Sequence, residues 1–227
     1  MFEIEFVFLI LNCKKYIYKS DVQKKLWLHK LPKNILYLHV IGDKALCNGN
    51  NYNLDMSNNK LYVNTLDDYV SLPDKVISAI AAINENFKYK YILKSDDDQK
   101  LINETYFLQI IDTLHKNNNY HYGGKICPMT KDIISNYWLY HASIGIDNGL
   151  PKNIFLKKTI YCAGRFYFLS YEVTNELIKQ KNEIKKYIIE DHCIGLYIPE
   201  KYKTNVWNIN VDEIFVDVVP PQKINFP

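Results

Sequence analysis

The first half of the chain alternates between short apolar runs and segments with helical spacing of apolar residues, and this alternation restricts the possible folds most. Runs rich in branched and aromatic residues, typical of buried strands, occupy residues 3–11, 34–41, 60–64 and 89–93. Helices are expected after an N-cap at Ser20, ending before Pro32, after an N-cap at Ser71, and over residues 104–116. The pattern predicts an α/β fold with a mostly parallel sheet and flanking helices.

The second half is less regular, and its apolar runs are interrupted by polar stretches. Strands are expected at residues 120–127, 160–169 and 214–219, and a helix at 171–181. The Asn-rich residues 44–59 are interpreted as a loop or a weak helix. No internal repeat or linker is visible, so residues 1–227 are interpreted as one domain, and the 48% hydrophobic content is enough for a sizeable core.

Composition excludes some classes of function. The net charge is only +3 and the lysines are scattered, so nothing indicates nucleic-acid binding. The apolar run at residues 6–11 is too short to span a bilayer, and Glu3 and Glu5 precede it where a signal peptide would be basic. A soluble or cytoplasmic protein is expected. The abundance of Asn, Lys, Ile and Tyr suggests an AT-rich genome, such as that of a large DNA virus or a parasite.

The five cysteines do not form a recognisable metal or redox motif. Their number is odd, and no two of them have C-x-x-C spacing. Reduced thiols are the simplest interpretation, and a disulfide stays an open alternative because sequence separation does not report spatial distance.

An acidic triplet, Asp96, Asp97 and Asp98, directly follows the apolar run at residues 89–93. In open α/β sheets, ligands bind outside the carboxyl ends of the strands. Three adjacent carboxylates repel one another unless a cation neutralises them, and Mn²⁺ or Mg²⁺ suits oxygen ligands. The triplet therefore indicates a metal site for a nucleotide diphosphate. The alternative is a solvated acidic turn. An EF-hand loop is not expected, because its Gly and its final Glu are missing.

The triplet belongs to a series of five motifs. They are K-K-L-W at residues 24–27, D-D-Y-V-S-L-P-D-K at 67–75, K-S-D-D-D at 94–98, Y-C-A-G-R-F-Y-F-L-S at 161–170 and E-D-H-C-I-G at 190–195. Their order and content resemble glycosyltransferase family 31, the β1,3-galactosyltransferase and Fringe-type family. That family has a basic-x-x-Trp segment, then D-x-Y-x-N-L-x-x-K, K-x-D-D-D, Y-x-x-G-x-x-Y-x-x-S and E-D-V-x-x-G. The resemblance covers roughly residues 5–197.

The resemblance implies a GT-A fold, an inverting mechanism and a nucleotide-sugar donor, usually a UDP-sugar, bound with Mn²⁺ or Mg²⁺. Asp98 matches the principal metal ligand of the family. Asp96 and Asp97 match positions near the ribose and sugar of the donor, and Asp96 is a second candidate metal ligand. Asp191 matches the proposed catalytic base. From the residues alone, a helix N-cap role for the Glu190 and Asp191 pair stays open.

Further residues of the motifs are candidates for substrate contacts. Those assigned to the donor are Lys94, Asp67, Tyr69 and Lys75. Those assigned to the acceptor side are Glu190, Gly164 and Trp138. Each has an alternative: Lys75 as a solvated lysine, Gly164 as a β-bulge, Trp138 as part of an aromatic cluster, and Glu190 as a residue that orients its loop.

Several positions depart from the family pattern. Lys24 and Lys25 stand where the family has an arginine-rich start, and Ser71 replaces the usual Asn. Some members bind the metal with a late His, but no His follows His192. A late acidic residue, Asp212 or Asp217, is a possible substitute, as are the diphosphate and water. His192 itself is a metal-ligand alternative to a structural histidine.

The sequence thus predicts a hexosyltransferase that moves a hexose or an N-acetylhexosamine to a hydroxyl of a glycan or glycoprotein, as in protein glycosylation, with a β1,3-type linkage. A catalytically inactive sugar-binding or nucleotide-sugar-binding relative is the main alternative. A metal-dependent nucleotidyltransferase or nuclease is a weaker one, because no second acidic pair is suitably placed. The oligomeric state, the donor sugar and the acceptor are not readable from the residues.

Overall fold

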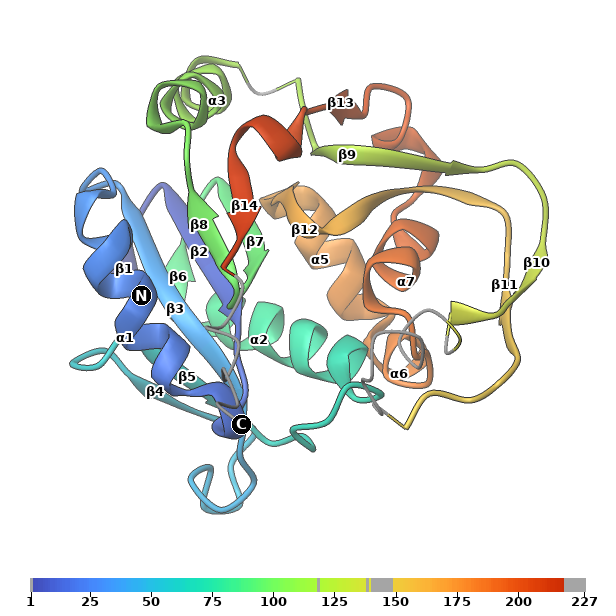
Figure 1. Cartoon of the computed structure of the whole chain (residues 1–227), viewed down its shortest axis with the longest axis horizontal. Coiled ribbons are helices and arrows are strands. Elements are labelled where there is room, and N and C mark those ends of the chain that lie inside the picture. Colours follow the sequence, from blue (N-terminus) through green and yellow to red (C-terminus); the bar gives the residue numbers. More distant parts are fainter. Residues whose placement is uncertain (1, 118, 138, 140–148, 219–227) are drawn as a thin grey trace, which may run out of the picture.

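A mixed sheet forms the centre of the computed structural model (Figure 1). The structure describes residues 2–117, 119–137, 139 and 149–218. Eight strands of this part of the chain belong to the sheet. In spatial order they are β13 (Trp207–Asn208), β9 (Tyr122–Met129), β12 (Thr159–Ser170), β7 (Tyr91–Asp96), β2 (Phe6–Leu11), β3 (Ile35–Gly42), β5 (Lys60–Val63) and β4 (Tyr52–Asp55). The neighbours β7, β2, β3 and β5 are parallel, whereas β12 runs antiparallel to both β7 and β9. The predicted α/β class is confirmed.

Helices cover both faces of this sheet because its central strands alternate between two cores. Along β2, Phe6, Phe8 and Ile10 belong to one apolar cluster, and the residues between them belong to the other. On one face lie α1 (Tyr18–Leu26) and α3 (Glu104–Lys116). On the other lie α2 (Leu72–Asn86), α5 (Tyr171–Lys179), α6 (Lys181–Ile184) and α7 (Glu190–Tyr197) (Figure 1).

Short elements connect and extend these layers. The two-stranded pairs are β1 (Phe2–Glu3) with β6 (Phe87–Lys88), β10 (Ile133–Ser135) with β11 (Ile154–Leu156), and β14 (Phe215–Asp217) with β8 (Gln99–Leu101). Single 3-10 turns lie at Lys14–Tyr16, Leu28–Lys30, Glu200–Tyr202 and Val211–Glu213. The pairing of β14 with β8 brings the late part of the chain next to the acidic triplet.

Two local expectations were wrong. The helix α1 begins at Tyr18, directly after the 3-10 turn, so Ser20 is a buried first-turn residue whose Oγ donates to the Ile17 carbonyl at 2.7 Å rather than an N-cap. The segment 44–59 contains the edge strand β4, which forms a hairpin with β5. Its side chains are mostly part-exposed, so it carries no continuous apolar run that the sequence could reveal.

All five cysteines are free thiols, and Cys47, Cys162 and Cys193 are buried. None of the helices that the structure describes combines the length and the apolar character that crossing a membrane requires.

Candidate active site

The acidic triplet lies at the carboxyl end of the parallel part of the sheet. Asp96 is the last residue of β7 and is paired in register with Leu11, the last residue of β2. Asp97 and Asp98 form the turn that leads into β8. This is the edge at which open α/β sheets bind their ligands, as the sequence predicts.

The helix α1 holds the backbone of this turn. Gln23 Nε2 donates to the Gln99 carbonyl at 2.9 Å and to the Asp96 carbonyl at 3.3 Å. The indole N–H of Trp27 donates to the same Gln99 carbonyl at 3.2 Å. The Trp of the K-K-L-W motif is therefore a support for the acidic turn. Gln23 was missed from sequence, since a polar residue within a helix is no signal by itself.

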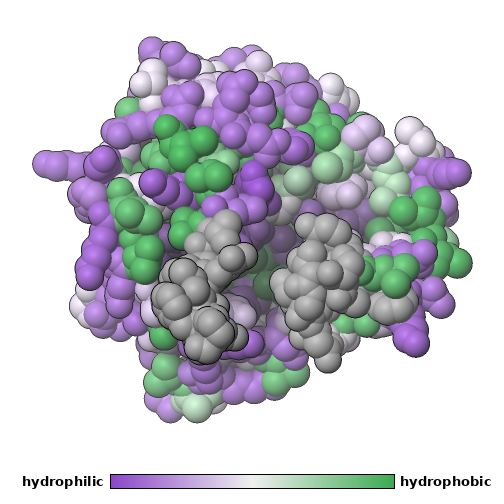
Figure 2. All heavy atoms as spheres, in the orientation of Figure 1, coloured by the Kyte–Doolittle hydropathy of each residue, from purple (hydrophilic) through white to green (hydrophobic). Residues whose placement is uncertain are grey.

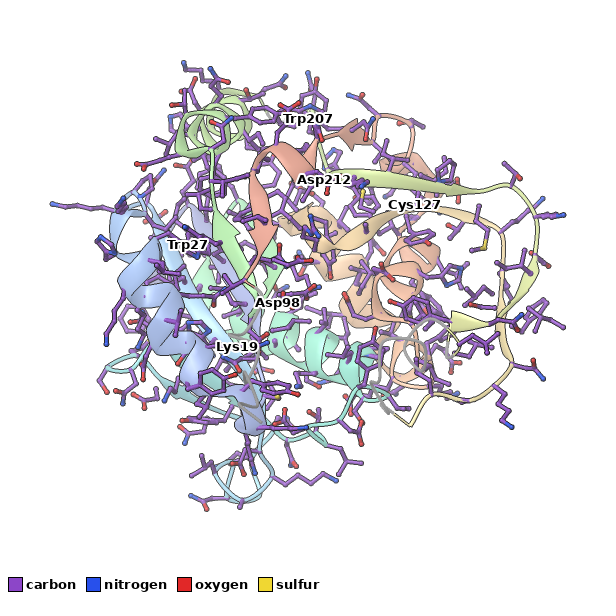
Figure 3. The ribbon with its side chains drawn as sticks, in the orientation of Figure 1. Lys19, Trp27, Asp98, Cys127, Trp207 and Asp212 are labelled. Atoms are coloured by element: carbon purple, nitrogen blue, oxygen red, sulfur yellow. The ribbon has the colours of Figure 1, made fainter. Side chains whose placement is uncertain are left out.

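The carboxylates of the triplet are crowded and partly desolvated. Burial raises the pKa of Asp97 to about 6 even though Lys19 Nζ lies 2.8 Å from its Oδ1. Burial, and then the negative charge of Asp96, raise the pKa of Asp98. A cation at this position would stabilise the ionised triplet. Lys19 and Asp98 lie near each other in Figure 3, and Lys19 is a second residue that sequence reasoning missed.

One late carboxylate approaches the triplet. Gln99 Nε2 donates to Asp98 Oδ1 at 2.7 Å and to Asp217 Oδ1 at 2.8 Å, so one amide bridges the two side chains. Asp217 also pairs with Arg165, the sole arginine of the chain, at 3.0 Å. Asp212 pairs with Arg165 and with Lys125 instead. In the described part of the chain no group of three His, Cys, Asp or Glu side chains is placed to hold a metal ion.

The E-D pair begins α7, and its two carboxylates have different surroundings. Glu190 is buried, accepts a hydrogen bond from the Tyr167 hydroxyl at 2.5 Å and lies 3.2 Å from Lys94 Nζ. Asp191 is partly exposed; its Oδ2 accepts from the Gly164 N–H at 3.0 Å, and Lys94 is a longer-range neighbour. Burial raises the pKa of the Asp191 carboxyl, and the charge of Lys94 opposes this rise. Asp191 is thus the more exposed residue of the pair.

The buried Lys75 and the half-buried Asp67 form an ion pair at the same edge of the sheet. Lys75 Nζ lies 2.6 Å from Asp67 Oδ1 and donates to the Asn12 carbonyl at 3.0 Å. Asp67 also accepts from the backbone N–H groups of Gly42 at 3.0 Å and Lys14 at 2.6 Å. The pair joins the ends of β2 and β3 to the loop before α2. All of these contacts are made to other residues of the protein, although the motif assigned both side chains to the donor.

The comparison with protein families identifies the family of the chain. The sequence model of the family described as galactosyltransferase matches residues 19–208, a range that contains all five motifs. The chain belongs to the galactosyltransferase family. It is therefore a glycosyltransferase, and the family together with the observed mixed sheet confirms the predicted GT-A-type fold.

Solved structures give more distant likenesses to this galactosyltransferase-family chain. Mouse xyloside xylosyltransferase 1 in its apo form is 9% identical, with 91% of this chain and 84% of that chain covered and a TM-score of 0.39. The galactosyltransferase LgtC, in complex with donor and acceptor sugar analogues, is 12% identical, with 84% and 70% covered and a TM-score of 0.40. No curated protein sequence matches the chain significantly.

The remaining candidates of the galactosyltransferase motifs occupy different places. The Tyr69 hydroxyl lies 3.3 Å from that of Tyr137, and burial, then Tyr137, and then the charges of Asp191 and Asp96 raise the pKa of Tyr69. Tyr69 thus lies near both halves of the site. His192 is buried and its Nε2 donates to the Lys157 carbonyl at 2.8 Å, as in a structural histidine. Trp138 lies outside the described residues.

Gly164 lies in an irregular part of β12. The register of β12 against β9 shifts between Cys162 and Tyr167, so this segment is a β-bulge. The bulge aims the Gly164 N–H at Asp191 and the Gly164 carbonyl at Lys94. The two interpretations of Gly164 as a bulge and as a site residue are therefore compatible.

Proposed function

We propose that the chain is an inverting, metal-dependent glycosyltransferase that moves a hexose or an N-acetylhexosamine from a UDP-sugar to a hydroxyl of a glycan or glycoprotein, forming a β1,3-type linkage. The observation that carries the proposal is that Asp96 and Glu190, from two motifs far apart in the sequence, share the ammonium group of Lys94. This contact sets the acidic triplet beside Asp191. The proposed donor and linkage are those that the resemblance of the five motifs to glycosyltransferase family 31 implies.

The carboxylate oxygens of the triplet are suitable ligands for a hard divalent cation. Mg²⁺ and Mn²⁺ bind to carboxylate oxygens, and Mg²⁺ commonly uses one or two carboxylates together with substrate phosphates and water. Asp98 is the proposed metal ligand and Asp96 the second candidate, while Asp217 is joined to Asp98 through the Gln99 amide. When bound, the cation would neutralise negative charge on the departing diphosphate. Asp97 and Tyr69 are proposed to contact the donor, with Lys19 beside them, and Asp67 and Lys75 to hold the adjoining loop.

Asp191 is proposed as the general base. Its carboxylate takes the proton of the acceptor hydroxyl while that oxygen forms a bond to the anomeric carbon and the bond from this carbon to the diphosphate breaks on the opposite side. Inversion follows from this single displacement. The Gly164 N–H donates to the Oδ2 atom of Asp191 at 3.0 Å and the His192 N–H donates to the Oδ1 atom at 2.7 Å, so both oxygens are held in place. Each carboxylate oxygen keeps a second lone pair that can accept the proton.

A panel of nucleotide sugars tests the proposal. The expected result is release of UDP from one UDP-sugar that requires both Mn²⁺ and a glycan acceptor, and that EDTA abolishes. Asp98→Ala should lose this activity, whereas Asp112→Ala, a change at an exposed residue that pairs with Lys116 on α3, should retain it. Donor binding without turnover would instead support the inactive, sugar-nucleotide-binding alternative. Absence of both binding and turnover would refute the proposal.

A further inference from the structure

Lys94 is a buried lysine whose ammonium group touches three parts of the active site. Its Nζ lies 2.8 Å from Asp96 Oδ1 on its own strand and 3.2 Å from Glu190 Oε2 on α7. It donates to the Gly164 carbonyl on β12 at 2.5 Å. We propose that Lys94 is a positioning residue that holds Asp191 in place through Glu190 and the Gly164 peptide, and that it does not bind the donor. The inference rests on the proposed function.

Gly164 connects Lys94 to Asp191 through its two backbone polar groups. Its carbonyl accepts from Lys94, and its N–H donates to Asp191 Oδ2 at 3.0 Å. Both backbone polar groups of one residue are therefore occupied, one by the cation and the other by the base. Because this residue lies in a bulge, its orientation is not imposed by the ladder between β12 and β9. Loss of the Lys94 contact would free the segment that orients the carboxylate.

Glu190 provides the second connection. It directly precedes Asp191 at the start of α7, and its carboxylate is held by the Tyr167 hydroxyl and by Lys94. Burial of a carboxylate without a partner is strongly unfavourable, so the ion pair fixes where the helix can begin.

Lys94 has no N–H group left for a phosphate. An ammonium group has three donors, and here three acceptors surround it: Asp96 Oδ1, Glu190 Oε2 and the Gly164 carbonyl. The side chain is only 3% exposed. Donor binding by Lys94, as the motif position suggested, would require it to leave one of these partners.

The double variant Lys94→Met/Glu190→Gln tests the role, because it removes the two buried opposite charges together. Asp96 also loses its partner, but its side chain is 42% exposed and stays solvated. Melting temperature, the Kd for UDP with Mn²⁺, and kcat for transfer would be measured beside wild type and the surface control Lys116→Met. The double variant should bind UDP within about threefold of wild type, while kcat falls by about 10²-fold, the scale of a general-base contribution. The control should match wild type in all three.

Tyr167→Phe is the milder variant that decides the question if the double variant does not fold. It removes the hydroxyl that donates to Glu190 and keeps the ring, which lies 5.5 Å from Lys94 Nζ. The kcat should fall about tenfold with unchanged UDP affinity. Wild-type kcat in either folded variant would overturn the inference. So would a Kd that rises in the double variant while kcat at saturating donor stays normal, since Lys94 would then be a donor ligand. A wild-type protein without transfer activity would refute the proposed function itself, and the inference with it.

Discussion

At the scale of single residues, the neighbours Glu190 and Asp191 show how surroundings separate two similar side chains. Glu190 is 7% exposed and bound to Lys94 and Tyr167, whereas Asp191 is partly exposed and oriented by the Gly164 N–H. Two carboxylates that a motif presents as a pair therefore have different surroundings, which supports the proposal of a different role for each.

Asp191→Asn should abolish transfer and leave donor binding intact. The amide keeps the shape of the side chain but cannot accept the proton, and a general base contributes about 10²–10⁴-fold. Glu190→Gln should reduce kcat less, because the Tyr167 hydroxyl can still donate to the amide oxygen. Steady-state kinetics and calorimetry with UDP and Mn²⁺ check both variants after their folding is confirmed. A dead Glu190→Gln beside an active Asp191→Asn would mean that the base was assigned to the wrong carboxylate.

His39 should make the protein less stable in mild acid. It is fully buried on β3, neither ring nitrogen has a hydrogen-bond partner within the described structure, and burial, with Lys24 and Lys60 nearby, lowers its pKa to about 3. Because the unfolded chain binds the proton more tightly, near pH 6.5, stability is complete above that pH and falls as the pH decreases towards 3. The loss should be about 1.4 kcal/mol per pH unit within this window.

His39→Leu should remove this part of the pH dependence. Urea unfolding of wild type and variant at pH 7 and pH 5 should show that wild type loses about 2 kcal/mol more than the variant over this interval. His29→Leu, a change at an exposed histidine, is the matched control and should behave as wild type does. Equal acid sensitivity of wild type and His39→Leu would show that His39 is not the cause.

At the scale of elements, a glycine lets α7 pack directly on β12. A Cβ at Gly195 would lie 2.7 Å from Tyr161 Cα and 2.9 Å from the Ile160 carbonyl oxygen, and both atoms are backbone. The helix that presents Asp191 is therefore in contact with the strand that orients it. Glycine here lets two backbones approach more closely than any side chain would allow. Sequence alone does not distinguish this use of glycine from its use for backbone flexibility.

Gly195→Ala should push α7 away from β12, because backbone atoms cannot yield as a flexible side chain does. We expect a loss of about 1–3 kcal/mol in the free energy of unfolding, with a lower kcat from the displaced base. Gly164→Ala is the comparison for stability, since its Cβ would meet nothing closer than 3.4 Å. Chemical denaturation of both variants checks the difference, and equal stability of the two would contradict the packing argument.

The elements that the sequence predicted well have strong local signals. The helix α3 was predicted with its observed bounds, Glu104–Lys116, because an amphipathic pattern follows Asn103, whose side chain accepts from the Tyr106 N–H. The start of α1 was wrong because a 3-10 turn leads into it without a side-chain cap. The strands β8, β10, β11 and β13 were not predicted, since two or three residues carry no period.

At the scale of the whole molecule, the site lies where several layers meet around the carboxyl edge of the sheet. The face seen in Figure 2 is largely hydrophilic, with hydrophobic residues in separate small groups. From the N-terminal side, Lys19 contacts the triplet, and from the C-terminal side β14 pairs with β8. A ligand bound there would contact residues from both ends of the described chain and should stabilise the fold as a unit.

UDP and Mn²⁺ should therefore raise the melting temperature together, and neither should do so alone. At a UDP concentration of about 100 times its Kd, the stabilisation is about 2.7 kcal/mol. For a chain of this size each 1 kcal/mol shifts the melting temperature by about 2–4 °C, so a rise of about 5–10 °C is expected. Thermal unfolding with and without EDTA measures it. Asp98→Ala should abolish the shift and Asp112→Ala should keep it; a normal shift in folded Asp98→Ala would show that Asp98 is not a ligand.

The sequence by itself determined the features that depend on neighbouring residues and on motif order. The strand and helix periods indicated the α/β class, the triplet followed its strand, and the five motifs identified the family. Only the tertiary structure decided which charges pair: Lys94 with Glu190, Lys19 with Asp97, and Arg165 with Asp217. These partners are 52 or more residues apart along the chain. They meet because of the order of strands in the sheet and the bulge in β12, and no periodicity of residues in one segment reports the position of another.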